Sequence, residues 1–208
     1  MTVLSGRDIV RLNAGQFAAA QRTLERAFLD YPLMIYACPE LATRSRGVRA
    51  LYAVILRDSL RYGEIYTSPG VEGVACWLQP GVPLPTFLRE VRAGLLGLPI
   101  AFGWQAFRCL IEYGQWHTKL HHELTSEPHW FLATIGVDPA CQGRGIGSAL
   151  LEAVLIKADN QQFPCYLETH GEKNARLYER HGFETVRLFD VPRYPVPVWA
   201  MLRRARNA

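Results

Sequence analysis

In the stretch 137-VDPACQGRGIGSALLEA-153, glycine alternates with other residues over 143–147, just before an amphipathic helical pattern. The pattern predicts that a helix begins near Gly145. The start of a helix carries unpaired N–H groups and the positive end of the helix dipole, and glycine lets an anion approach this backbone closely. Arg144 adds a positive charge and Ser148 adds a hydroxyl donor. We therefore expect this segment to bind a pyrophosphate group.

Three alternatives to this interpretation make different demands on the surrounding residues. A Walker loop needs a lysine after its last glycine, and no lysine stands near this segment. A dinucleotide fingerprint needs the spacing GxGxxG, whereas this chain has GxGxG, late in its length and with no second mononucleotide half after it. Glu168, about 20 residues beyond Gly147, nevertheless matches the acidic residue of that fingerprint. A tight strand-to-helix turn without a ligand also stays open.

Strands and helices alternate around the glycine segment. The residue types and periodicity predict, in order, a strand at 129–137, a helix at 145–160, a strand at 164–170, a helix at 172–181, a strand at 182–191 and a last strand at 196–202. This alternation argues for a mixed α/β sheet with helices on its faces, and we expect no domain boundary.

The first half of the chain supplies further helices and a hairpin. The predicted elements are helices at 16–29 and 46–62, strands at 64–68 and 71–79 joined by a tight turn at Pro69–Gly70, and two or three helices within 84–124 packed on one side of the sheet. The apolar run 95–107 is too short for a membrane span, and we interpret it as a buried helix.

Composition narrows the class of protein. The 208 residues are 49% hydrophobic and 20% charged, which fits a globular domain rather than a disordered chain. The net charge of +4 comes from mostly scattered basic residues, which favours an anionic ligand over a nucleic-acid track. Five cysteines without CxxC spacing predict neither a disulfide framework nor a zinc site, and we expect a cytoplasmic protein without a secretory signal.

The order of motifs carries a family resemblance. "WFLATIGV" (130–137), the glycine segment, "YLET" (166–169) and "NARLYERHGF" (174–183) together resemble the GNAT superfamily of acetyl-CoA-dependent N-acetyltransferases. The likeness is nearest to the puromycin N-acetyltransferase branch. His170 stands where relatives commonly have serine, so puromycin itself is not implied.

The resemblance implies an α/β (α+β) fold, namely a GNAT-type mixed central sheet of about six or seven strands flanked by helices, with extra helices from the middle of the chain over the acceptor side. It implies one domain over 1–208, in which 1–128 supply mainly acceptor-side helices and first strands and 129–208 form the acetyl-CoA-binding half. Acetyl-CoA is the expected co-substrate, and no metal is expected. The residues implied to bind it are Ile135, Gly136, Val137, Gln142, Gly143, Arg144, Gly145, Ile146, Gly147, Ser148, Asn174 and Tyr178.

Amide formation needs an acid for the thiolate, a base for the amine and a donor for the oxyanion. Tyr178 resembles the family tyrosine that donates to the coenzyme A sulfur, although a half-buried structural tyrosine is the alternative. For the base we expect Glu168, at a strand end where desolvation would raise its pKa, unless it pairs with an arginine or a water chain serves instead. The oxyanion donor is expected to be a backbone N–H near Ile135 or Gly136. Asn174 either bonds the pantetheine arm, fixes the loop or caps a helix.

The acceptor side is expected to come from aromatic residues of the first half, namely Tyr31, Tyr36, Trp104 and Trp116, which suit a small hydrophobic amine but equally suit a core. His117 and His121 have the spacing of a two-histidine metal face without an obvious third ligand, so a solvated polar face or a pH-sensitive patch near the cleft is the favoured interpretation.

We thus expect direct transfer of an acetyl group to a primary amine of a small molecule. The alternatives are a non-catalytic acyl-CoA-binding sensor or partner module, and acetylation of a protein or tRNA-linked amine. Neither nucleic acid nor membrane is an expected partner, and the protein is expected to be a monomer or homodimer.

Overall fold

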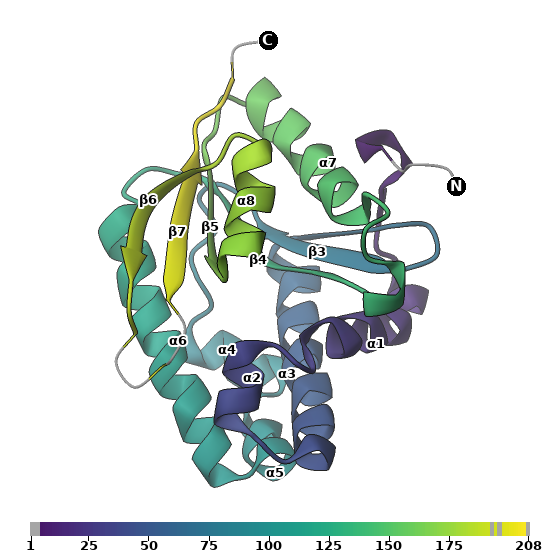
Figure 1. Cartoon of the computed structure of the whole chain (residues 1–208), viewed down its shortest axis with the longest axis vertical. Coiled ribbons are helices and arrows are strands. Elements are labelled where there is room, and N and C mark those ends of the chain that lie inside the picture. The colour runs from purple at the N-terminus through teal and green to yellow at the C-terminus, as the bar shows by residue number, and fades with distance from the viewer. Residues whose placement is uncertain (1–4, 192–193, 195–196, 207–208) are drawn as a thin grey trace.

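The computed structural model describes residues 5–191, 194 and 197–206, and these residues form a seven-stranded sheet with helices on both faces (Figure 1). The order across the sheet is β1-β2-β3-β4-β5-β7-β6, and among these neighbours β4 and β5 alone run parallel. The strands are β1 (Val10–Arg11), β2 (Glu64–Thr67), β3 (Gly73–Leu78), β4 (Trp130–Val137), β5 (Cys165–His170), β6 (Glu184–Phe189) and β7 (Val198–Arg203). The predicted mixed sheet of six or seven strands is confirmed.

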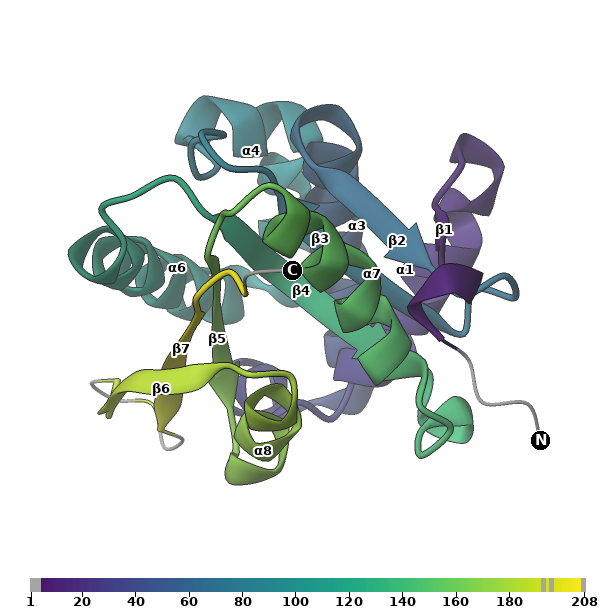
Figure 2. The same ribbon diagram turned by 90° about the horizontal axis from the view of Figure 1, so that it is seen from above.

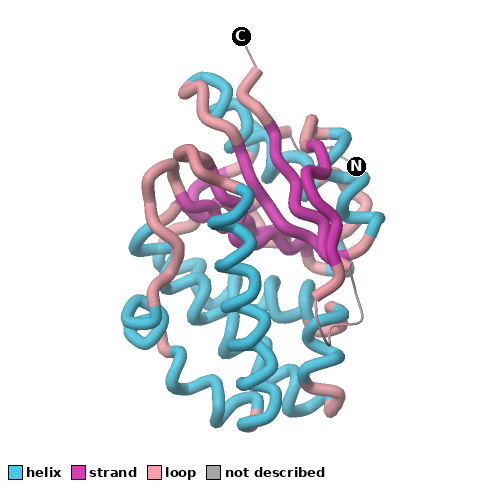
Figure 3. The backbone as a smooth tube through the Cα atoms, turned by 90° about the vertical axis from the view of Figure 1, so that its left-hand side faces the viewer, coloured by secondary structure: helices cyan, strands magenta, loops and turns pink. Residues whose placement is uncertain are grey.

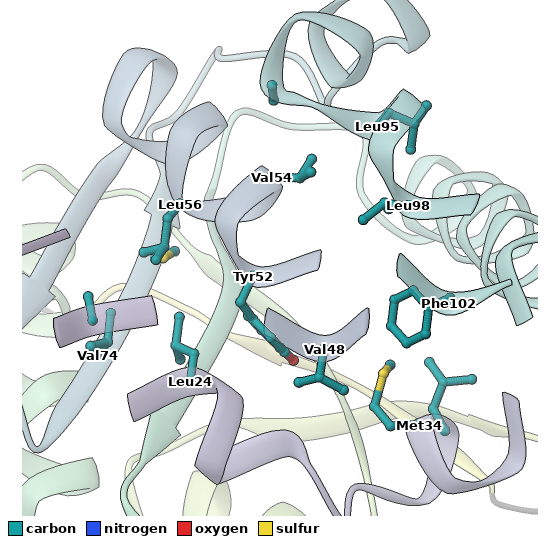
Figure 4. Close-up of a cluster of buried hydrophobic side chains, with 14 of the residues drawn as sticks. Leu24, Met34, Val48, Tyr52, Val54, Leu56, Val74, Leu95, Leu98 and Phe102 are labelled. Atoms are coloured by element: carbon teal, nitrogen blue, oxygen red, sulfur yellow. The ribbon is translucent and has the colours of Figure 1, made fainter. Parts of the chain in front are cut away.

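Helices cover the two faces of the sheet separately (Figure 2). On one face, α1 (Phe17–Phe28) contacts β3 and β4, while α3 (Leu41–Tyr62) contacts β2 and β3. On the other face, α7 (Ile146–Asn160) packs on β3 and β4, and α8 (Glu172–Arg180) packs on β5. Two large apolar clusters result, one on each face; Figure 4 shows the first, in which Leu24 and Val74 lie beside residues of α3.

The middle of the chain forms a second group of helices beyond the sheet. Figure 3 shows the strands gathered in the upper half of the molecule and helices filling the lower half. These helices are α2 (Pro32–Ala37), α4 (Phe87–Ala93), α5 (Leu98–Phe102) and α6 (Trp104–Leu124), and the short 3-10 turns are η1 (Gly6–Asp8), η2 (Ala14–Gln16), η3 (Leu95–Gly97) and η4 (Pro139–Cys141). The expected helices of 84–124 are therefore present.

The prediction of one buried helix over 95–107 is wrong. The run is instead divided among η3, α5 and the start of α6, and it is interrupted at Gly103, whose φ of 82° belongs to the left-handed region that favours glycine. Within α5, residues two apart in the sequence lie on opposite sides of the helix. Leu98 is buried, but Ile100 is 84% exposed. Hydrophobicity alone could not show this, because it does not tell which side of a short helix faces the core.

The predicted hairpin is confirmed. Strand β2 pairs with β3 in antiparallel register from Glu64 opposite Trp77 to Thr67 opposite Val74. The helix predicted to begin near Gly145 begins at Ile146, with Gly145 as its N-cap at a φ of 80°. Part of the predicted strand at 196–202 falls on residue 196, outside the described residues, and the described part begins at Val198.

Strands β4 and β5 separate part-way along their length. They pair only from Trp130 opposite Cys165 to Leu132 opposite Leu167, although both strands continue. On its other side β4 stays paired with β3, but the register jumps there and leaves Ala133 without an opposite residue. Such a bulge bends its strand. The bend lies where β4 leaves β5, so it accounts for the gap that opens between the two strands.

Candidate functional site

A cavity of about 260 Å³ fills the gap between β4 and β5, and we call it the splay cavity. Its walls come from both layers of helices as well as from the two strands. They comprise Phe28, Tyr31, Leu33, Met34, Leu51, Tyr52, Ile55, Leu110, Tyr113, His117, Leu132, Ala133, Thr134, Ile135, Glu168, Thr169, His170, Asn174 and Tyr178. The cavity thus brings together Glu168, Tyr178, Ile135 and Tyr31, which the sequence placed far apart.

The glycine segment lies directly after the strand that lines this cavity. Gly143 and Gly145 both have positive φ, of 76° and 80°, so they make the turn from β4 into α7. None of the described side chains caps α7, which leaves the N–H groups of its first turn for a ligand or water. Gln142 Nε2 donates to the carbonyl of Val137 at 3.2 Å and ties the loop to the strand end.

Gly147 differs from the other two glycines. Its φ is not positive, and a Cβ on it would meet only Val137 at 3.8 Å and Leu177 at 4.0 Å, which are ordinary contacts. The fold would therefore accept alanine here. A glycine in the first turn of a helix whose N–H groups are free fits the close approach of an anion, so the loop as a whole fits a pyrophosphate.

Gly136 is explained by packing instead. A Cβ on it would come within 2.9 Å of Leu24 and Phe28 and 3.0 Å of Ala27, so the absence of a side chain lets α1 approach β4. Ile135, Gly136 and Val137 lie beyond the last pair with β5, which leaves that side of β4 without a neighbouring strand. This is the position at which an extended ligand can pair with β4.

Tyr178 and Asn174 project from α8 toward the splay cavity. Burial raises the pKa of Tyr178 well above its ordinary value, so the hydroxyl keeps its proton and can donate it. Asn174 Nδ2 donates to the carbonyl of His170 at 3.0 Å and holds the end of β5 to the start of α8. The N-cap alternative for Asn174 is wrong, because Gly171 occupies that position.

Glu168 lies on the acceptor side of the gap and is almost wholly buried. Its Oε1 accepts a hydrogen bond from the Tyr166 hydroxyl at 2.7 Å, and His117 Nε2 of α6 lies 2.8 Å from its Oε2. Only 1% of the Glu168 side chain is exposed, compared with 26% for His117. The carboxylate therefore has a histidine as partner and not the arginine that the sequence allowed.

His170 joins two tyrosines at the end of β5. The Tyr31 hydroxyl lies 2.6 Å from Nδ1 of His170, and the Tyr113 hydroxyl lies 2.9 Å from Nε2. Burial lowers the pKa of His170 to about 4 and raises that of Tyr31 to about 12, so the three groups stay neutral near pH 7. A neutral imidazole has one N–H, hence one tyrosine donates to the ring and the other accepts from it.

A second, larger pocket of about 860 Å³ opens between α2, α6 and the segment after β6, and we call it the outer pocket. Most of its wall is apolar or aromatic, with one exposed ion pair of Arg108 and Glu112 at 3.6 Å. Leu33 and Tyr113 line both the outer pocket and the splay cavity. Its lining is Leu33, Tyr36, Trp104, Gln105, Arg108, Cys109, Glu112, Tyr113, Trp116, Val191 and Tyr194.

The expected acceptor residues thus divide between two places. Tyr31 lines the splay cavity, whereas Tyr36, Trp104 and Trp116 line the outer pocket. Trp104 is 65% exposed, so it is no core residue.

Sequence reasoning missed Tyr113, noted His170 only as a departure from relatives at the border of the acceptor side, and gave His117 no part in catalysis. The sequence did carry a signal for His170. Residues two apart in a strand share one face, so His170 lies on the same face of β5 as Tyr166 and Glu168. No such signal pointed to Tyr113.

The metal alternative gains no support from this geometry. His121 Nε2 contacts His129 Nε2 at 2.9 Å, while His117 turns to Glu168. Within the described part of the chain, no group of three or more histidine, cysteine, aspartate or glutamate side chains is placed to hold a metal ion.

Comparison with known proteins identifies the family. Residues 107–185 match the acetyltransferase (GNAT) domain, which spans α6 to β6 and therefore includes the splay and the glycine segment. This segment of the chain is therefore an acetyltransferase (GNAT) domain. An uncharacterised N-acetyltransferase of Schizosaccharomyces pombe is 25% identical over 179 residues, which are 83% of this chain and 72% of that protein.

Solved GNAT structures share the fold over nearly the whole chain. A structure described as histone acetyltransferase HPA2 and related acetyltransferase, from Corynebacterium glutamicum, superposes with a TM-score of 0.71 at 24% identity, covering 96% of this chain and 97% of the other. Arylalkylamine N-acetyltransferase 2 from Aedes aegypti gives a TM-score of 0.57 at 15% identity, covering 95% and 98%. At these identities the likeness concerns the fold alone.

This GNAT protein is an acyltransferase that acts on amines. The nearer likeness to the puromycin branch stays a prediction. No helix among the described residues is both long enough and apolar enough to cross a membrane.

Proposed function

We propose that this GNAT protein transfers the acetyl group of acetyl-CoA directly to the primary amine of a small, largely apolar molecule while both substrates are bound. The observation that carries the proposal is the position of the splay cavity. It lies between Tyr178 of α8 on one side and the aromatic outer pocket on the other, and it shares Leu33 and Tyr113 with that pocket.

The coenzyme side of the proposal rests on the loop and the free strand side. The N–H groups of 143–147 and the start of α7 would hold the pyrophosphate, with Gln142, Arg144 and Ser148 around them. Ser148 Oγ currently bonds His181 Nε2 at 3.0 Å, which leaves the hydroxyl able to reorient. The pantetheine arm would pair with 135–137 and bring the thioester into the splay cavity, near Asn174 and Tyr178.

The chemistry then divides between the two sides of the gap. Tyr178, kept protonated by burial, would donate to the departing thiolate. The amine would enter from the outer pocket and lose its proton on the Glu168 side of the gap. A backbone N–H near Ile135 or Gly136 would stabilise the oxyanion, because these residues face no strand on that side of β4.

The acceptor class follows from the outer pocket. Its aromatic wall offers large contact area to an apolar or aromatic amine, and one pair of opposite charges supplies its polar contact. The scattered charge of +4 gives no track for tRNA, and a pocket with an enclosing aromatic wall suits a small amine better than a protein terminus.

The expected location and assembly stay predictions. Five free cysteines agree with a reducing cytoplasm, and a monomer or a homodimer is expected.

The test measures free thiol released from acetyl-CoA with three sets of amines: phenethylamine and tryptamine, aliphatic polyamines, and a short peptide with a free N-terminus. The proposal expects turnover with the first set. Stabilisation by acetyl-CoA without thiol release from any amine would instead support the acyl-CoA-binding sensor. Turnover of the peptide alone would support a protein acceptor.

A further inference from the structure

Two histidines line the splay cavity on its acceptor side, and their contacts suit them to different tasks. Both ring nitrogens of His170 are engaged by the hydroxyls of Tyr31 and Tyr113. The ring is buried and stays neutral near pH 7. His170 therefore has no free nitrogen with which to accept a proton from an amine, and its evident role is to hold the two tyrosines in place.

His117 has the opposite arrangement. It lies one turn after Tyr113 on α6, and its Nε2 is the nitrogen that faces Glu168 Oε2 at 2.8 Å. Among the described residues, Nδ1 of His117 has no hydrogen-bond partner, and the side chain is 26% exposed. One nitrogen thus lies against a carboxylate oxygen, while the other has no partner in a ring that lines the cavity.

Glu168 is held too firmly to meet the amine itself. Oε1 accepts from the Tyr166 hydroxyl, and only 1% of the side chain is exposed, compared with 26% for His117. Oε2 has no aligned hydrogen-bond donor, so His117 is the charge partner that the described residues offer it. A positive charge on the His117 ring would compensate this buried oxygen, which is how a carboxylate stabilises an imidazolium that forms during a reaction.

We propose that His117 is the general base that takes the proton of the acceptor amine, and that Glu168 is a positioning residue that acts through His117. The inference rests on the proposed function and refines the sequence prediction, in which Glu168 itself was the base. Tyr166, Glu168 and His117 then form a chain in which each group orients the next.

The amine lone pair forms the new N–C bond, and an N–H proton passes to Nδ1 of His117. The C–S bond breaks, its electron pair leaves with sulfur, and the thiolate takes the proton of Tyr178. His117 then releases its proton to solvent, and Tyr178 takes one from solvent, which restores both groups.

Other titratable groups surround His117 and enter any pH profile. They are Tyr113 and His121 on α6, and Glu168 and His170 on β5. His121 and His170 stay neutral over the working range because burial lowers their pKa values to about 3 and about 4. His121 and His170 therefore contribute no titration to the profile between pH 5.5 and 8.

The test compares kcat/KM between pH 5.5 and 9.5 for the wild type, His117→Gln and His117→Ala, with the amine that the wild type uses best. The matched control is His122→Gln, an exposed residue of the same helix. At pH 7, His117→Gln should lower kcat/KM by about a hundredfold without changing the Kd of acetyl-CoA. Its activity should then follow only the ionisation of the free amine, and added imidazole should partly restore His117→Ala.

Glu168→Gln tests the positioning role separately. It keeps the imidazole but removes the charge behind it, so it should lower kcat/KM by about tenfold or more and change the pH profile while KM for the amine stays the same. Wild-type activity in His122→Gln is expected throughout.

Three other experimental outcomes would overturn parts of this proposal. An unchanged pH profile in His117→Gln, or a loss that imidazole does not restore in His117→Ala, overturns His117 as the base while leaving the transferase. If His117 variants do not fold, an unchanged profile in Glu168→Gln overturns the pair. If the wild type itself turns over no amine, the proposed function fails and this inference falls with it.

Discussion

Lowering the pH from 7.5 to 5 should destabilise this protein through two buried histidines, His121 and His170. Burial lowers the pKa of His121 to about 3 and that of His170 to about 4, from an ordinary value of 6.5. In the unfolded chain both rings would bind a proton below pH 6.5, whereas in the fold they resist it. The contribution of these two neutral histidines to the free energy of unfolding is therefore fully present above pH 6.5, and it is lost as the pH falls toward their folded-state pKa values.

The contacts of His121 show why it resists protonation. His129 Nδ1 lies 2.7 Å from the carbonyl oxygen of Glu127, which can only accept, so Nδ1 carries the proton of that neutral ring. His129 Nε2 must then accept from His121 Nε2, at 2.9 Å. His121 Nδ1 is left buried without a partner, and a proton added there would have no acceptor.

At pH 5 each of the two histidines should cost about 2 kcal/mol of unfolding free energy, or about 4 kcal/mol together. Because pH 5 lies above both folded-state pKa values, the loss depends little on their exact size. The combined loss of about 4 kcal/mol is a large share of the free energy of unfolding of a typical domain, which is roughly 5–15 kcal/mol. Burial lowers the pKa values of His129 and His181 in the same direction.

The measurement is urea unfolding at half-unit steps between pH 7.5 and 5, a window in which most carboxylates stay ionised. His121→Leu is the control, because it removes one titrating ring. The fall between pH 7.5 and 5 should be about 2 kcal/mol smaller in this variant, whatever its absolute stability. If the variant keeps the whole fall, or if the wild type is equally stable at both pH values, the reasoning is refuted.

Three other predictions concern the site. Tyr178→Phe should lower kcat about a hundredfold in the thiol-release assay and leave the calorimetric Kd of acetyl-CoA unchanged, and wild-type turnover would exclude the acid role. Gly147→Ala should raise the free energy of unfolding in urea by about 0.5–1 kcal/mol and weaken acetyl-CoA binding about tenfold. Gly143→Ala should instead destabilise the fold, because Gly143 has a φ of 76°. Unaltered acetyl-CoA binding in Gly147→Ala would show that the loop does not hold the anion. Trp104→Ala should raise KM for aromatic amines about three- to tenfold, because Trp104 lines the outer pocket. Thermal stability should not fall, since this side chain is 65% exposed. An unchanged KM would show that the acceptor binds elsewhere.

Local patterns in the sequence predicted most of the fold. The alternation of strands and helices after residue 129, the hairpin at 64–79 and the start of α7 were read from periodicity, β-branched runs and glycine positions, all of which act over a few residues. The prediction of one buried helix over 95–107 was wrong for a physical reason. Leu98 and Ile100 are both strongly hydrophobic, but they lie on opposite sides of the short helix α5, so Leu98 faces the core and Ile100 is 84% exposed.

The site was predictable to the extent that it is local. The glycine segment and the order Asn174, Tyr178 are contiguous motifs, so the sequence by itself determined an anion-binding helix start and a tyrosine on the following helix. Only the tertiary structure decided the partners of Glu168 and His170. His117 and Tyr113 reach them from a helix more than fifty residues earlier in the chain. Contacts between distant segments depend on how α6 packs beside β5 and on the bulge at Ala133 that opens the sheet, and neither is encoded in a short stretch of sequence.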